Sequence, residues 1–171
     1  EAEQFFQWVV EDSFVSGRPG WENGGAGLVS DVLPFEGMRL RMLNGSRSFL
    51  AYLGCLAGYG HISDCMADAS YRAAARALML QDQAPTLRTQ GVDLEAYADS
   101  LIARYGNRAI KHRTYQSATD GTQKLPQRLL DSARWHLRNG TSCDFVLLGV
   151  AGWMRYVSGV DEQGQAIEIR D

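Results

Sequence analysis

The chain has 171 residues, enough for one domain with a hydrophobic core, and its net charge at pH 7 is -3. This acidic balance argues against nucleic acid or an anionic membrane surface as a partner, and no run approaches the roughly 18 apolar residues of a membrane span. The three cysteines are odd in number and lack metal-ligand spacing. We therefore expect reduced thiols, no metal site and a cytoplasmic location.

The first segment, Glu3 to Phe14, carries apolar residues at helical spacing and predicts a short helix that ends before Gly17. Gly25 and Gly27 follow in a glycine-rich loop. This loop fails as a dinucleotide-binding fingerprint because no predicted strand precedes it and the third glycine is missing. We expect no nucleotide site there, and an extended stretch from Leu28 to Val32.

The segment from Pro34 to Tyr59 predicts the central helix. Proline is favoured in a first helical turn, and Gly58 and Gly60 supply a stop. The helix is apolar nearly all round, which is typical of a buried helix. Its polar arc is made of four side chains, namely Glu36, Arg39, Asn44 and Arg47. Buried polar groups need partners or a wet cleft, so either the core satisfies them or one face lines an active site.

Helical signals continue to the end of the chain and predict an all-α, multi-helical domain around the central helix. The expected elements are a turn at His61–Met66 and helices at 69–81 (capped by Asp68), 93–105 (capped by Asp93), 108–119, 126–139 and from Ser142 or Asp144 to Val157.

No catalytic triad can be identified, and each lone histidine is interpreted as structural. Lys124 is different, because it is predicted to lie in a loop just before a helix that begins at Pro126. A lysine beside the positive end of a helix favours an anionic ligand, whereas the alternative is a solvated surface lysine.

Several motifs together resemble the C-terminal domain of the mannitol dehydrogenase family, the polyol-specific long-chain dehydrogenases. Within that family they are most similar to the fructuronate reductase (D-mannonate oxidoreductase) branch. The resemblance covers nearly the whole chain and rests on WVVEDSF, GRPGWE, GMRLRMLNGSRSFLAYLGCLAGY and TDGTQKLPQRLLDSARWHL. It implies a fold like the C-terminal domain of 6-phosphogluconate dehydrogenase and a metal-independent, NAD-dependent reaction between a secondary alcohol and a ketone. It also implies that residues 1–171 are a fragment whose N-terminal Rossmann domain, absent here, binds most of the NAD.

The resemblance also implies roles for residues of the central helix. The family pattern is Lys-x4-Asn-x2-His, and the matching positions here are Arg39, Asn44 and Arg47. The family's asparagine helps to hold the substrate oxygen, which implies that role for Asn44. Arg39 replaces the family's acid/base lysine, and Glu36 keeps an acidic position implied in proton relay. Arg39, Asn44 and Glu36 are thus the implied catalytic positions.

Two further positions are implied to contact a small sugar acid or polyol. Arg47 replaces a substrate-contacting histidine, and Lys124 matches a lysine of the family's substrate site. Gln116 stands where mannitol-type members carry an arginine, which favours the uronate-type branch.

Three interpretations remain open on sequence alone. The chain is the substrate and catalytic half of a dehydrogenase, or a catalytically silent relative that keeps the fold and sugar-acid binding, or a helical interaction module. The polar arc argues against the module. Arg39 and Arg47 separate the first two, because arginine is a poor proton acceptor and stands at both positions where the family carries a lysine and a histidine.

Overall fold

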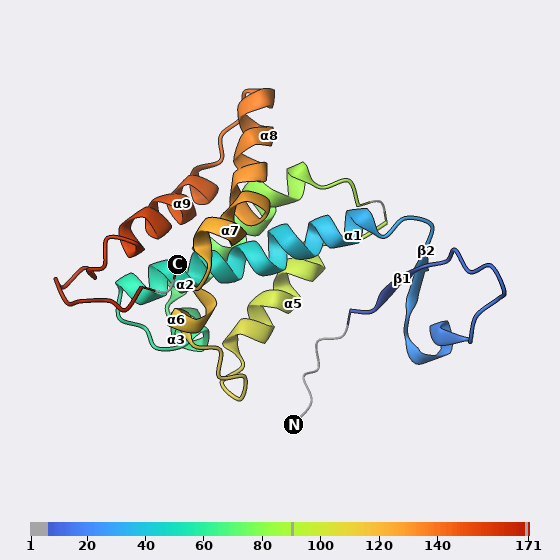
Figure 1. The fold of residues 1–171 in the computed structure, drawn as a ribbon, viewed down its shortest axis with the longest axis horizontal. Helices are drawn as coiled ribbons and strands as arrows, with labels where there is room; N and C mark the ends of the chain where they lie inside the picture. Colours follow the sequence, from blue (N-terminus) through green and yellow to red (C-terminus); the bar gives the residue numbers. More distant parts are fainter. Residues whose placement is uncertain (1–6, 90, 170) are drawn as a thin grey trace.

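The computed structural model describes residues 7–89, 91–169 and 171. One continuous helical run crosses the middle of the molecule (Figure 1). It consists of α1 (Leu33–Met38), η2 (Arg39–Gly45) and α2 (Ser46–Leu56). The predicted central helix is therefore confirmed, although it begins one residue earlier and ends at Leu56, ahead of Gly58 with its positive φ of 79°.

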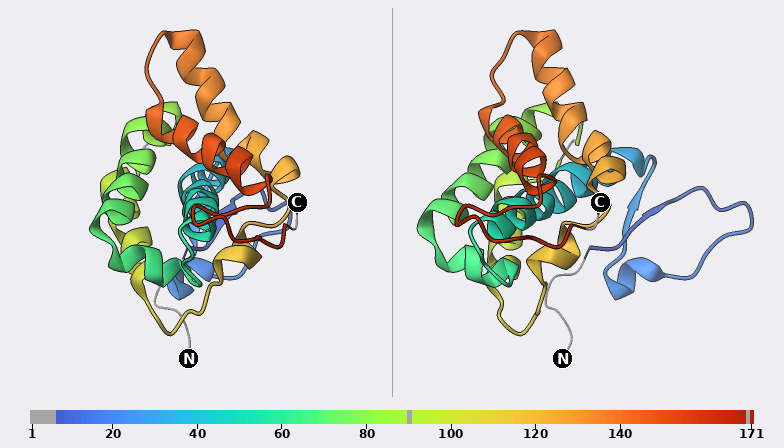
Figure 2. Two further views of the ribbon diagram at one scale, coloured as in Figure 1. Left: turned by 90° about the vertical axis from the view of Figure 1, so that its left-hand side faces the viewer. Right: turned by 60° about the vertical axis from the view of Figure 1, so that its left-hand side comes forward.

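The central run is the core of the domain. α2 buries eight of its eleven residues, and Met42, Phe49 and Tyr52 are fully buried. Figure 2 (left) looks along this run and shows the other helices around it. They are α3 (Ile62–Ala67), α4 (Ala69–Ala77), η3 (Leu78–Gln83), η4 (Ala84–Thr86), α5 (Leu94–Gly106), α6 (Thr114–Ser117), α7 (Gly121–Leu125), η5 (Pro126–Leu130), α8 (Asp131–Asn139) and α9 (Asp144–Tyr156). The all-α prediction is confirmed.

The predicted N-terminal helix from Glu3 to Phe14 is wrong where the structure describes it. Val9–Glu11 forms strand β1, which pairs in parallel with β2 (Gly27–Val29), and η1 (Trp21–Gly24) lies between them. Residues 3–6 of that prediction lie outside the described part. Two consecutive valines favour extended backbone, and the partner strand overlaps the start of the stretch from Leu28 to Val32 that was predicted to be extended.

Two helix boundaries in the second half also differ from the prediction. Of the segment 108–119 only α6 is helical, because the backbone around His112 pairs with the start of α3: the Ile62 N–H donates to the His112 carbonyl at 2.9 Å. The next helix begins at Gly121 in α7 rather than at Pro126, and Pro126 opens η5 within it.

Caps explain where the remaining helices begin. The Asp68 carboxylate accepts from the Ser70 N–H at 2.7 Å, and that of Asp93 accepts from Ala96 at 2.9 Å, as predicted. Neither Ser142 nor Asp144, the two predicted caps, occupies the N-cap position of α9, which is Cys143. A carboxylate from η3 serves instead: Asp82 accepts a hydrogen bond from the Val146 N–H at 2.8 Å.

We expect Asp82→Ala to lower the free energy of unfolding by about 2 kcal/mol at pH 7, because it leaves buried N–H groups of α9 without an acceptor. Asp82→Asn keeps an acceptor oxygen and should remain near wild type. Burial raises the pKa of Asp82 in the folded protein above the unfolded value of about 3.9. The stabilisation that Asp82 provides is therefore greatest below this unfolded pKa and declines as the pH rises through the folded-state pKa. Urea unfolding of the three proteins at about pH 4 and pH 7 tests this, and equal losses for Ala and Asn would contradict the capping role.

Candidate functional site

The four side chains of the predicted polar arc lie along a less buried part of the central run, which we call the polar stripe. Glu36 and Arg39 are exposed, while Asn44 and Arg47 are half-buried between fully buried neighbours. In a regular α-helix, residues five apart are separated by about 140° around the axis. Segment η2 instead makes π-type i→i+5 hydrogen bonds, which reduce the angle between such residues. The π-helical segment therefore narrows the arc between Arg39 and Asn44, which a 100° helical wheel places near its two edges.

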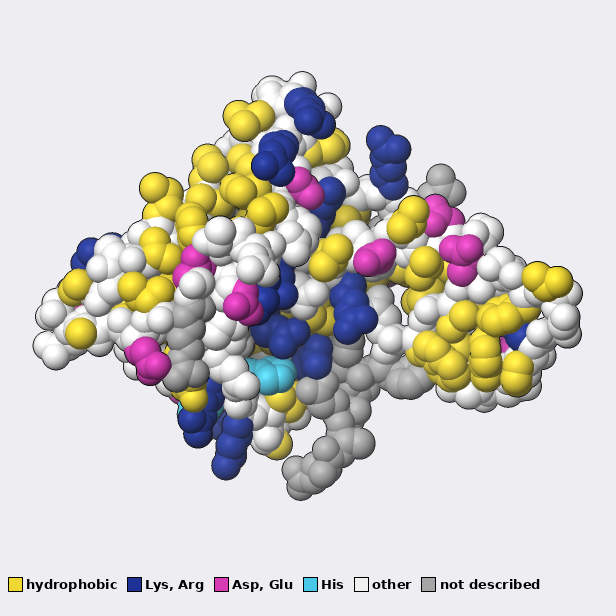
Figure 3. Space-filling view, in the orientation of Figure 1, with side chains coloured by type: hydrophobic (Ala, Val, Ile, Leu, Met, Phe, Trp, Pro, Cys, Tyr) yellow, Lys and Arg dark blue, Asp and Glu magenta, His cyan; other side chains and the backbone are white. Residues whose placement is uncertain are grey.

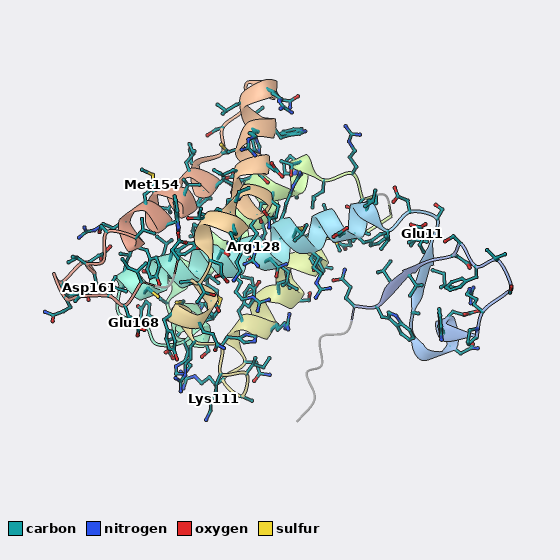
Figure 4. The ribbon with its side chains drawn as sticks, in the orientation of Figure 1. Glu11, Lys111, Arg128, Met154, Asp161 and Glu168 are labelled. Atoms are coloured by element: carbon teal, nitrogen blue, oxygen red, sulfur yellow. The ribbon has the colours of Figure 1, made fainter. Side chains whose placement is uncertain are left out.

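A pocket of about 270 Å³ opens beside the second half of this stripe. We call it the cationic pocket, and its lining residues are Arg47, His112, Gln116, Ser117, Lys124 and Arg128. Figure 3 shows Lys and Arg side chains gathered around a histidine at the centre of this face, and Figure 4 labels Arg128 there. The structure thus brings two of the predicted substrate-contacting residues, Arg47 and Lys124, together.

Asn44 is linked to this pocket through Arg47. The Arg47 Nη2 donates a hydrogen bond to the Asn44 Oδ1 at 3.3 Å. With its oxygen engaged, the amide presents its Nδ2 donor group in another direction. The contact therefore gives the Asn44 side chain a defined orientation.

Lys124 lies in the last turn of α7 and not in a loop before a helix, so the predicted helix-end environment is wrong. Its Nζ donates to the Thr119 carbonyl at 2.9 Å and forms an ion pair with the Asp120 carboxylate at 2.8 Å. The hydrogen bond from Lys124 holds the pKa of Asp120 below its ordinary value. Lys124 is thus positioned and largely neutralised by its own segment.

Arg128 is the pocket residue that the sequence analysis missed. Its Nη1 donates to the buried Ser48 hydroxyl of α2 at 2.9 Å. Its Nε is buried and has no hydrogen-bond partner in the described part of the chain. Burial lowers the pKa of Arg128, and the nearby charge of Arg47 lowers it further. The available signal was its spacing: Arg128 follows Lys124 by four residues, which places both on one helix face.

Glu36 and Arg39 line a different hollow of about 330 Å³, together with Trp8, Val9 and Phe35. The structure shows no ion pair between Glu36 and Arg39 among the residues it describes. Arg39 therefore does not share the cationic pocket with Arg47 and Lys124, and Asn44 lies between the two regions along the run.

The histidines have structural surroundings or border the pocket. His136 is buried, with its Nε2 2.6 Å from the Asp82 carbonyl and its Nδ1 2.7 Å from the Thr141 hydroxyl. His61 lies at the N-cap of α3. Residues 7–89, 91–169 and 171 contain no group of three or more His, Cys, Asp and Glu arranged to hold a metal ion.

The family model for the mannitol dehydrogenase C-terminal domain matches residues 31–171. The chain belongs to this family. It is 69% identical to the oxidoreductase YdfI and 61% identical to D-mannonate oxidoreductase, both of Escherichia coli K12; each comparison covers 99% of this chain and 35% of the relative. The Pseudomonas fluorescens mannitol 2-dehydrogenase, solved as a ternary complex with NAD and D-mannitol, superposes with a TM-score of 0.87 at 39% identity, covering 98% of this chain and 34% of that one.

The chain therefore spans about a third of the length of these relatives. The family resemblance seen in the motifs is confirmed, and so is the helical fold that it implied. Among the helices described, none has the length and apolar character required to cross a bilayer.

Proposed function

We propose that this chain is the C-terminal, substrate-binding and catalytic domain of an NAD-dependent oxidoreductase that interconverts a sugar alcohol or aldonate with its keto form. Family membership supports the reaction class, and relatives named for mannonate and mannitol support the two substrate types. The observation that carries the proposal is the polar stripe on a buried helix, in which Asn44 is oriented by Arg47 beside a pocket of about 270 Å³.

The described residues alone do not suit NAD. The parallel strands β1 and β2 are three residues long and are joined by the single turn η1, so they lack the crossover helix whose N-terminus would face a pyrophosphate. We infer that a Rossmann domain elsewhere in the full-length protein holds most of the cofactor. When bound, NAD accepts hydride from the alcohol carbon, and this chain's residues act on the alcohol oxygen.

Asn44 is the residue best suited to that oxygen. Its Oδ1 accepts from Arg47, which leaves the Nδ2 group to donate to the substrate oxygen as charge develops on it. Glu36 and Arg39 lie one to two turns earlier on the same stripe, at the hollow beside β1, and would act on the proton. Arginine can donate a hydrogen bond there but accepts a proton poorly.

A catalytically silent relative is the competing proposal, favoured by Arg39 and Arg47 in place of the family's lysine and histidine. The deciding experiment measures reduction of NAD by the full-length protein with D-mannonate or D-mannitol. Turnover supports the enzyme, whereas binding of the sugar acid without turnover supports the silent relative.

We expect Asn44→Ala to lower kcat and kcat/KM together by about 10²–10³-fold, the usual effect of losing a donor to a developing oxyanion. Asn23→Ala, at an exposed position in η1, is the matched control and should leave both constants unchanged. A rise in KM without a fall in kcat would show that Asn44 only binds substrate.

A further inference from the structure

The cationic pocket has more positive than negative charge. Arg47, Lys124 and Arg128 line it, and within the described part of the chain the one carboxylate that pairs with any of them is Asp120, bound to Lys124 at 2.8 Å. The hydrogen-bond acceptors of Arg47 and Arg128, an amide oxygen and a hydroxyl, are neutral. Neither guanidinium group forms an ion pair with a carboxylate among the residues described, and Asp120, whose charge acts on Arg128, is already paired with Lys124.

Contacts with two other segments hold Arg128 in place at the pocket. Ser48 fixes one end of its guanidinium, and the Arg128 carbonyl accepts from the buried Gln83 Nε2 at 3.3 Å. The Nε is buried and has no partner in the described structure, so a ligand in the pocket would meet the Nη groups of Arg128. A fixed planar fork of this kind matches a carboxylate through two parallel hydrogen bonds.

The position of the pocket suits the unreactive end of a substrate. A carboxylate carbon has no hydrogen to give up as hydride, so the carboxylate of a sugar acid must lie apart from the carbon that is oxidised. The cationic pocket shares no lining residue with the hollow at Glu36 and Arg39, and Asn44 lies between Arg39 and Arg47 along the helical run and bonds to Arg47. An open-chain sugar acid could therefore extend from Asn44 into the pocket.

We propose that Arg128, together with Arg47, binds the carboxylate of an open-chain sugar acid and sets the preference for it over a neutral polyol. Lys124, neutralised by Asp120, then contacts hydroxyl groups. The inference rests on the proposed function and adds the residue that determines the substrate class.

The test compares Arg128→Gln, Arg128→Lys and wild type in the full-length protein, with kcat/KM measured for D-mannonate and D-mannitol. We expect the mannonate-to-mannitol ratio to fall about 10- to 100-fold in Arg128→Gln, and less in Arg128→Lys, which keeps the charge but not the fork. Arg134→Gln, at an exposed position in α8 that pairs with Asp131, is the control and should leave the ratio unchanged. An equal loss for both substrates would overturn the proposal, because it would make Arg128 merely structural.

Calorimetry on the same proteins separates this inference from the proposed function. If wild type oxidises neither substrate, the proposed function fails, and binding of mannonate that is weakened by Arg128→Gln still supports the carboxylate site. If inorganic phosphate binds more tightly than mannonate and depends on Arg128, the pocket is a phosphate site and the proposal is wrong. If Arg128→Gln unfolds, the ratio and binding in Arg128→Lys decide.

Discussion

Arg39→Lys should raise the rate of alcohol oxidation by the full-length protein about 10²–10⁴-fold near neutral pH, the usual contribution of a general base. Oxidation requires a group that accepts the proton of the alcohol. A lysine in the hollow beside β1 can lose its proton when a bound substrate removes water from around it, whereas arginine in general accepts or loses a proton poorly. The oxidation rate of Arg39→Lys should also rise with pH as the lysine amine deprotonates. The pH–rate profile of the wild-type protein should lack this rise.

The control for this substitution is Arg41→Lys in the same π-helical segment. The Arg41 guanidinium donates to the Thr86 carbonyl at 2.7 Å and to its hydroxyl at 2.6 Å, so it is engaged with η4 and away from the hollow. We expect its replacement to leave the pH profile unchanged. Equal oxidation rates for arginine and lysine at position 39 would mean that another group, with Glu36 the first candidate, accepts the proton.

The sequence predicted those parts of the fold that depend on local signals. Apolar residues all round the central segment predicted its burial, and aspartates at 68 and 93 predicted two helix starts, because a cap is a contact within three residues. Contacts between distant segments were not predictable in this way. The pairing of β1 with β2, the backbone bond from Ile62 to His112 and the capping of α9 by Asp82 each join residues that are far apart in the chain.

The candidate site likewise has residues that the sequence identified and residues that only the structure brought into view. Motif resemblance identified Arg47 and Lys124 as neighbours of one ligand, and the structure places both in the cationic pocket. Arg128 carried no recognised role, and its involvement follows from the way η5 crosses η2. The smaller angle between Arg39 and Asn44 around the helix axis depends on the π-type hydrogen bonds of η2, which a wheel drawn at 100° per residue does not include. The roles of Glu36, Arg39, Asn44, Arg47 and Lys124 stay predictions.

Two glycines of the central run are expected to respond in opposite ways to replacement by alanine, because η5 packs closely against one of them and not against the other. A Cβ added to Gly45 would lie 2.6 Å from the Arg128 carbonyl oxygen and would also clash with the Gln83 Nε2, so one backbone would have to move. A Cβ added to Gly37 meets nothing nearer than the Leu87 Cδ2 at 4.0 Å. Both glycines are helical with ordinary backbone, so alanine is otherwise favoured at each position.

We therefore expect Gly45→Ala to lower the free energy of unfolding of the 171-residue chain by about 2–3 kcal/mol, and Gly37→Ala to raise it by about 0.5–1 kcal/mol. Urea denaturation of the two variants and wild type measures both changes, with an unchanged slope showing that the folded states remain comparable. A neutral Gly45→Ala would mean that η5 shifts without cost. In that case Arg128 is not rigidly held, and its fork would have to be ordered by the ligand. A large loss at Gly45 means instead that the packing of η5 on η2 fixes Arg128 before any ligand arrives.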